Sequence, residues 1–175
     1  MSPRLSRQAR LLQVLTILGM ALLLLMPALI WAEPGIGRPV AGWRGALEGL
    51  AWPDRLAGWA LGLPPFLAAA IGLGQLHGFC RSLARREVFS AAAARALGRF
   101  GWCLIAAAIA LPCSRLAVIW HVSPPGTSAG GMLALLGVLP VMALLMGIIM
   151  GLVFVIFAAI LDEATRLAEE NAGFV

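Results

Sequence analysis

Two histidines are the residues of this sequence best suited to hold a metal ion or a haem, and their placement argues against both. His77 lies near one end of a long apolar stretch, and His121 lies just beyond the far end of the next stretch. If both stretches cross a membrane, the two imidazoles lie on opposite faces and cannot ligate one centre. We therefore expect no metal site and no cofactor, and we interpret both histidines as polar groups satisfied between helices or at the interface.

Cysteine chemistry and catalytic motifs are equally sparse. Cys80, Cys103 and Cys113 form no C-x-x-C pair, and the predicted outer loops contain no cysteine, which disfavours a disulfide relay. Cys80 and Cys103 flank an arginine-rich segment, where acylation or thiol chemistry is the alternative to the small apolar role that we favour. No P-loop, dinucleotide-binding, H-E-x-x-H or G-x-S-x-G motif occurs. The sequence therefore predicts no catalytic residues and no enzyme.

Arg115 is the one residue among Asp, Glu, Lys and Arg that lies inside a predicted membrane span, which makes this intramembrane charge a candidate functional group. It lies five residues before Trp120, so its side chain can reach the interface along its apolar stem. We favour this interpretation, or an ion pair with an acidic residue of the first loop: Glu33, Glu48 or Asp54.

Composition places the chain in a lipid bilayer. Of its 175 residues 61% are hydrophobic and 12% are charged, and the mean hydropathy is +0.94. Soluble domains are about 45–50% apolar and about 25% charged. All 13 basic residues are arginines, and most lie at the ends of apolar stretches. We interpret the net charge of +5 as a signal of membrane topology and expect no direct nucleic-acid binding.

Four apolar stretches are long enough to cross a hydrocarbon core of about 30 Å. They run from Leu11 to Trp31, from Leu56 to Cys80, from Phe100 to Trp120 and from Met132 to Leu161. The predicted fold is all-α, an integral membrane four-helix bundle forming a single four-span domain, with residues 162–175 as a cytoplasmic tail helix. Three G-x-x-x-G spacings, at 58–62, 74–78 and 147–151, permit close helix contact, although chance matches are expected with 20 glycines.

The placement of arginine predicts the orientation of these spans. Nine arginines lie in the N-terminal segment, the loop between the second and third spans, and the tail, whereas three lie in the first loop. The positive-inside rule then puts both termini in the cytoplasm. A composition rich in alanine, glycine, leucine and arginine but without lysine is typical of a GC-rich prokaryotic genome, so we expect a prokaryotic inner membrane. Cleavage of the first span as a signal peptide is the alternative, but its apolar run of about 20 residues exceeds the roughly 7–15 of such peptides.

Three segments outside the spans have helical patterns. In the first loop Trp43, Leu47 and Leu50 share one helical face, which predicts a short interfacial helix on the outer leaflet. In the second loop Ser90 can cap a helix over 91–97. The second loop and the tail carry opposite charges, so they either pair with each other or form an interaction face. The residues of this face are Arg81, Arg85, Arg86, Arg95, Arg99, Glu169 and Glu170.

Two pieces of the sequence resemble a known family. The first comprises Phe79–Leu83, Glu87–Ser90 and Arg95–Gly101, and the second is Ala164–Asn171 followed by Val175. They are similar to the turn and Arg-x-Leu helix before the third span, and to the closing L-x-E-E-N segment, of prokaryotic proteins catalogued as domain of unknown function 2975. Glu87 stands where that family usually has glycine. The resemblance implies four spans but no chemistry, and it implies a small helix-turn-helix regulator as a partner.

Two functions are compatible with the sequence. The first is a non-enzymatic multi-pass membrane protein that engages a cytoplasmic or membrane partner through its arginine-rich loop and acidic tail. The alternative is a small transporter or channel subunit, for which neither the substrate nor the oligomeric state follows from the sequence. Its path would have to use the few polar residues within the spans: Gln13, Thr16, Gln75, His77, Ser114 and Arg115.

The predicted orientation can be tested with reporter fusions. A reporter fused after Val175 should be active only in the cytoplasm, and one inserted near Pro125 only outside, because of the arginine asymmetry. The opposite pattern would overturn the orientation and would move the arginine-rich loop to the outer face.

Overall fold

The computed structural model describes residues 3–32, 49–84, 90–123 and 141–172. These residues hold five helices: α1 (Pro3–Ala32), α3 (Trp52–Gly62), α4 (Pro64–Ala84), α5 (Ala91–Val122) and α7 (Val141–Ala172). No strand occurs among them. The predicted all-α class is confirmed.

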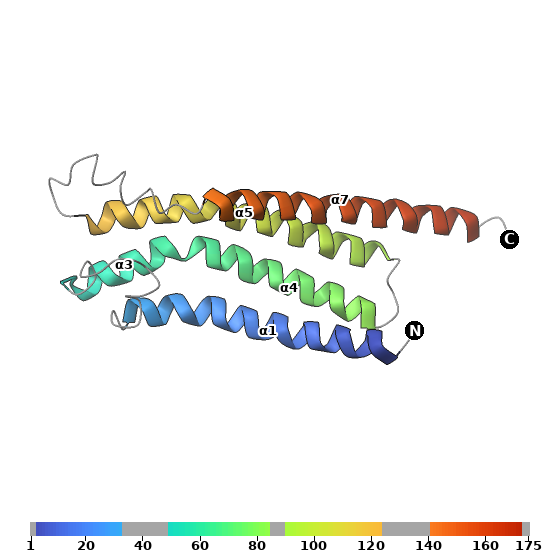
Figure 1. Ribbon diagram of the computed structural model, residues 1–175, viewed down its shortest axis with the longest axis horizontal. Helices are drawn as coiled ribbons and strands as arrows, with labels where there is room; N and C mark the ends of the chain where they lie inside the picture. The colour runs from blue at the N-terminus through green and yellow to red at the C-terminus, as the bar shows by residue number, and fades with distance from the viewer. Residues whose placement is uncertain (1–2, 33–48, 85–89, 124–140, 173–175) are drawn as a thin grey trace.

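The long helices lie side by side in a single layer, in chain order (Figure 1). α1 packs on α4, α4 on α5, and α5 on α7, while the short α3 contacts α1, α4 and α5. Among the described residues α1 and α7 do not contact each other, and α7 contacts only α5. The described helices therefore form an open row, and the predicted four-helix bundle is not confirmed. An open row can still shield its apolar faces from water, because lipid can cover the faces that a bundle would bury.

Three of the helices are long and apolar enough to cross a membrane: α1 over Leu11–Leu29, α5 and α7. The remaining span predicted from the sequence, Leu56–Cys80, falls on α3 and α4 together. These two helices meet at a bend of 45°. In Figure 1, α3 continues from α4 along the same layer, and it also contacts α5. By length and composition this bent pair forms either one broken span or a re-entrant loop.

The break between α3 and α4 comes from two consecutive prolines. Pro64 and Pro65 lack the N–H groups that would continue the hydrogen bonding of α3, and their rings clash with the preceding turn of a helix. The chain therefore restarts at Pro64, and the carbonyl of Leu63 accepts hydrogen bonds from the backbone N–H groups of Phe66 and Leu67, both at 3.0 Å. Proline in the first turn of a helix costs nothing, since those N–H groups have no helical acceptor.

Several boundaries differ from those predicted. The capping role of Ser90 is confirmed, because its side chain accepts from the Ala93 N–H at 3.2 Å. The helix that it starts runs without interruption to Val122, so the predicted segments 91–97 and 100–120 are one helix. α7 continues to Ala172, as predicted for the tail. Most of the predicted interfacial helix at 43–50, and the start of the fourth span at 132–140, lie outside the described residues.

Little of this layer is buried within the protein. The buried apolar residues gather mainly on α5, which lies between two neighbours. α1 and α7, in contrast, expose large side chains along their length, including Leu15 and Leu25 on α1 and Ile149 and Ile156 on α7. Contiguous apolar surface of this extent requires a non-aqueous environment. The exposed faces thus agree with the composition in indicating a membrane protein.

Glycine sets how closely α5 and α7 approach. A Cβ added at Gly101 would lie 2.6 Å from the carbonyl oxygen of Gly151, and one added at Gly151 would lie 2.8 Å from the carbonyl oxygen of Gly101. One turn further along, a Cβ at Gly147 would lie 2.7 Å from that of Ala108. The two backbones therefore touch, which permits weak Cα–H···O contacts and dense packing.

The other two G-x-x-x-G spacings do not form such contacts. A Cβ at Gly78 would meet nothing within 4 Å, and one at Gly74 would meet only the sulfur of Met20 at 3.9 Å. Gly58 is packed, but against the Trp31 side chain and not against a helix backbone. Conversely Gly72, which belongs to no such spacing, lies where a Cβ would be 2.9 Å from that of Cys103 on α5. The spacing alone therefore identified one helix contact of three.

Gly151→Ala should destabilise the protein by about 1–3 kcal/mol, because the new Cβ overlaps Ile105 and the Gly101 carbonyl in a backbone contact that cannot move aside. Gly78→Ala is the matched control and should be neutral or slightly stabilising, because alanine favours helix. Unfolding in mixed detergent micelles, followed by circular dichroism, measures both. Equal stability of the two variants would contradict the close approach of α5 and α7.

Candidate functional site

The charged side chains that the structure describes lie mainly toward the two ends of the layer, and Thr16 and His77 form a polar contact between the helices. We call the end that holds Arg81, Arg95 and Arg99 the arginine end, and the end that holds Trp31, Asp54 and His121 the aromatic end. Neighbouring helices run antiparallel: Gly19 contacts Leu73, Gly72 contacts Cys103, and Gly98 contacts Ala158. The start of α5 and the end of α7 therefore lie at the same end, the arginine end, as Figure 1 shows.

At the arginine end the tail of α7 extends past the start of α5. The contacts of Gly98 with Ala158 and of Gly101 with Val155 fix the register of the two antiparallel helices. This register places Ala91, the first residue of α5, level with Thr165, which is buried. Residues 166–172 of α7 therefore project about 10 Å beyond α5, at 1.5 Å per residue. This projection carries Glu169 and Glu170, and both are exposed.

The ion pairs described in the tail lie within α7. Arg166 donates from Nη2 to Glu163 Oε1 at 2.8 Å, and its Nε lies 3.6 Å from Glu170 Oε1. All three side chains are more than half exposed, so each pair contributes only about 0.2–1 kcal/mol. Arg81, Arg95 and Arg99 are exposed as well, and Arg85 and Arg86 lie outside the described residues. Docking of the tail on the arginine-rich loop stays a prediction.

Between the two ends, Thr16 of α1 and His77 of α4 form a polar contact across an apolar interface. The Thr16 hydroxyl is 4% exposed and donates its proton to the carbonyl of Gln13 at 2.8 Å. Its oxygen lies 3.3 Å from His77 Nδ1. Because the hydroxyl proton is already engaged, Nδ1 carries the hydrogen and donates to Thr16. His77 is thus satisfied between helices, as the sequence analysis expected.

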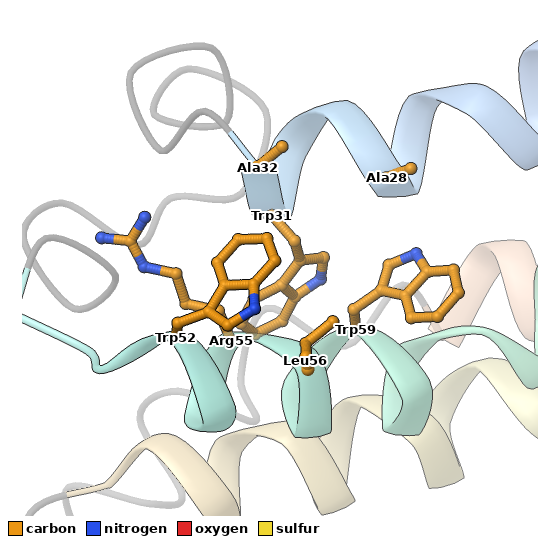
Figure 2. Close-up of a pocket in the computed structure, with 7 residues that line it drawn as sticks. All are labelled: Ala28, Trp31, Ala32, Trp52, Arg55, Leu56 and Trp59. Atoms are coloured by element: carbon orange, nitrogen blue, oxygen red, sulfur yellow. The ribbon is translucent and has the colours of Figure 1, made fainter.

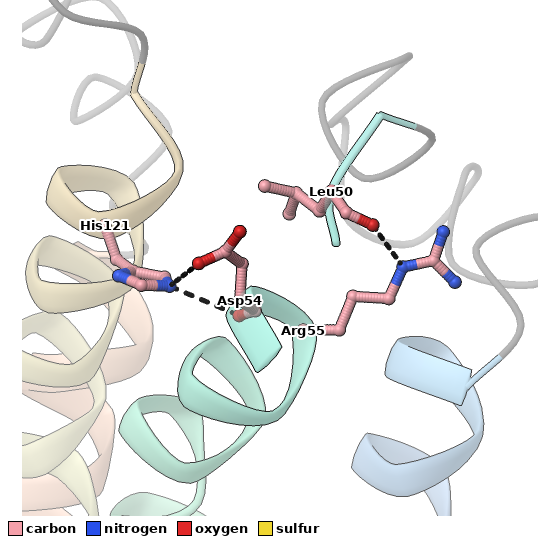
Figure 3. Close-up of polar contacts among 4 residues, drawn as sticks. All are labelled: Leu50, Asp54, Arg55 and His121. Atoms are coloured by element: carbon pink, nitrogen blue, oxygen red, sulfur yellow. Dashed lines mark hydrogen bonds and ion pairs between the residues drawn. The ribbon is translucent and has the colours of Figure 1, made fainter. Parts of the chain in front are cut away.

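At the aromatic end His121 of α5 contacts Asp54 of α3. His121 Nε2 lies 3.2 Å from the Asp54 backbone oxygen, which can only accept, so Nε2 carries the hydrogen (Figure 3). The Asp54 carboxylate oxygen Oδ1 is 3.9 Å from the same nitrogen. The sequence analysis proposed Asp54 as an ion-pair partner of Arg115 and did not predict its contact with His121. The available signal was that both residues lie just beyond the apolar stretches at one predicted face.

Arg115 itself lies on α5 and is half-buried, less than two helical turns before His121. Two of the partners proposed for it, Glu33 and Glu48, lie outside the described residues. Its predicted reach to the interface stays a prediction. The cysteines are free thiols: Cys80 is buried, Cys103 half-buried and Cys113 exposed. Among the described residues no group of three or more metal-ligating side chains occurs.

An aromatic cavity lies between α1 and α3 at this same end (Figure 2). Three indoles line it, from Trp31 on α1 and from Trp52 and Trp59 on α3. The ring of Trp31 lies across Gly58, where any Cβ would overlap it. Arg55 contributes the one charged side chain of the lining, and its Nε donates to the Leu50 carbonyl at 3.2 Å (Figure 3). The sequence analysis did not predict this cavity, because its wall is formed by residues from two different helices.

Gly58→Ala should displace the Trp31 indole from α3, shift tryptophan emission to longer wavelength, and destabilise the protein by about 1 kcal/mol. Gly62→Ala is the control, since its Cβ would meet only Val118 at 3.9 Å. Emission spectra and detergent unfolding measure the two effects. In a Trp31→Phe background the emission shift should vanish; a shift that persists there would show that Trp31 does not lie over Gly58.

Comparison with protein-family models identifies the family of this chain. The model described as "Protein of unknown function (DUF2975)" matches residues 44–173, which include α3, α4, α5 and α7 in full. No curated protein and no solved structure matches the chain. The match covers well over half of the sequence and agrees with the resemblance carried by the arginine-rich loop and the tail. The chain belongs to the DUF2975 family of proteins of unknown function.

Proposed function

We propose that this protein is a non-enzymatic, multi-pass protein of a prokaryotic inner membrane, whose arginine end binds a protein partner in the cytoplasm or the membrane. In this proposal α1, the broken α3–α4 span, α5 and α7 are four membrane crossings, with both chain termini in the cytoplasm. The charge asymmetry of the sequence supports this orientation. The layer then serves to hold the arginine end at the membrane surface.

The observation that carries the proposal is the projection of α7 beyond α5, the one described helix that it contacts. Past Thr165, by the register of the two helices, α7 extends beyond the first residue of α5 for about two turns, and the side chains of residues 166–171 are exposed. Glu169 and Glu170 on this projection are exposed at the same end of the layer as Arg95 and Arg99 of α5, which lie level with residues 161 and 157 of α7. A helix end that carries both charge signs and packs on no described neighbour is a surface that a partner of complementary charge can bind.

A small helix-turn-helix regulator is the partner class that the family resemblance implies. The ion pairs of Arg166 with Glu163 and Glu170 are weak, so a partner can replace them with its own ion pairs at little cost in free energy. Arg166 would then become available to the partner together with both acidic side chains.

The alternative, a small transporter or channel subunit, is favoured by one observation: the Thr16–His77 contact places two polar side chains between apolar helices. A transport path would pass this contact. Thr16→Val should then lower flux of a protonated or polar substrate in liposomes, whereas the partner proposal expects binding at the arginine end to be unaffected.

Site-specific photo-crosslinking in native membranes tests the partner proposal. A photoreactive residue at Ala168, on the exposed projection, should give a crosslinked product with a second protein. The same residue at Ala143, exposed at the opposite end of α7, is the matched control and should give none. Reversal of both charges, Glu169→Arg with Glu170→Arg, should lower the yield several-fold, because each exposed pair contributes about 0.2–1 kcal/mol.

Added salt should lower the yield in the same way, since the pairs are exposed and screened. The proposal fails if the product at Ala168 survives the double reversal at low salt, or if Ala143 yields the same product.

A further inference from the structure

The aromatic cavity has the size and lining of a site for part of an apolar ligand. Its volume is about 260 Å³, and its lining is almost wholly apolar: Ala28, Trp31, Ala32, Trp52, Leu56 and Trp59, with the stem of Arg55. Sites for whole small molecules are commonly about 300–1,000 Å³. A cavity slightly below that range holds one segment of a larger molecule, and its apolar walls select a hydrocarbon segment.

Arg55 decides which kind of head group can accompany that segment. Its Nε–H donates to the Leu50 carbonyl, which fixes the side chain at the rim, and its terminal nitrogens point away from the indoles (Figure 2). A cation placed among the three indoles would benefit from their π faces. It would also meet the guanidinium charge, so the cavity disfavours a quaternary ammonium and favours an anion at the rim.

Trp59 adds a hydrogen-bond donor to the same wall. Its Nε1 is buried and has no hydrogen-bond partner among the described residues. A buried indole N–H without an acceptor is unfavourable, and buried tryptophans normally find one. Trp59 follows Arg55 by one helical turn, about 6 Å along α3. A small rotation of its indole would direct this N–H toward a ligand acceptor that lies one helical turn deeper in the cavity than a group bound by Arg55.

We propose that the cavity binds one anionic phospholipid from the adjoining leaflet. Its phosphate meets the Arg55 guanidinium at the rim, one acyl chain lies among Trp31, Trp52 and Trp59, and an ester carbonyl accepts from Trp59 Nε1. A phospholipid carries these three groups in this order of depth. The cavity also lies at the end of the helices, where tryptophan and arginine side chains meet lipid head groups. This site is independent of partner binding at the arginine end.

Native mass spectrometry of the full-length protein, delipidated in detergent and titrated with phosphatidylglycerol or phosphatidylcholine, tests the proposal. The wild type should bind one phosphatidylglycerol with higher affinity than phosphatidylcholine. Arg55→Gln should weaken phosphatidylglycerol binding by about tenfold, as expected for loss of a charge-assisted hydrogen bond. Arg99→Gln, which removes an exposed arginine at the opposite end, should leave it unchanged.

A second pair of variants tests the cavity without changing charge. Ala28→Phe places a ring in the cavity and should weaken binding, whereas Ala21→Phe, on an exposed part of α1 two turns away, should not. Trp59→Phe keeps the apolar wall but removes the donor and should weaken binding by a smaller factor. Binding of short-chain fatty acid in place of phosphatidylglycerol would assign the site to a free carboxylate and overturn the lipid assignment. Unchanged affinity in both Arg55→Gln and Ala28→Phe would overturn the site itself.

Discussion

The close approach of α5 and α7 at Gly101 and Gly151 shows the constraint on which this structure depends. Lipid tails are as apolar as leucine, so the hydrophobic effect does not draw the helices of such a chain together. The spans carry few polar groups that could hydrogen-bond between helices. Contact must then come from dispersion between closely packed surfaces, and only residues without a side chain let two helix backbones meet.

The same constraint accounts for the open row of helices. α5 lies between α4 and α7: its Gly98, Gly101 and Ala108 approach α7, and Gly72 of α4 approaches its Cys103. α1 and α7 present large aliphatic side chains on their outer faces, which pack no better on protein than on lipid. Packing α1 against α7 would therefore gain little free energy. In the described part of the chain, polar contacts between helices lie at the helix ends, where water and head groups are available, and at Thr16 and His77.

The all-α fold class and the approximate positions of the long apolar helices could be predicted from the sequence. Composition and apolar stretches reflect the bilayer environment and do not depend on how the helices pack. The sequence also identified the Ser90 cap and the helical tail, whose signals are local. It did not reveal which glycines pack. Gly78 and Gly151 occupy equivalent places in the same spacing, and only their neighbours on other helices distinguish them. The same holds for the Trp31–Gly58 contact and for the Asp54–His121 pair, which join residues from different helices.

The distance between α1 and α7 in a bilayer tests the central claim, the open row, most directly. Nitroxide labels at Leu18→Cys and Ile156→Cys, with the three native cysteines replaced by alanine, lie on exposed faces at matching depth. With α4 and α5 between them and helices spaced about 8–10 Å apart, double electron–electron resonance should give a distance of about 20–30 Å. Dilution with unlabelled protein removes distances between copies. A distance below about 15 Å would mean that α1 and α7 meet in a closed bundle, and it would contradict the account.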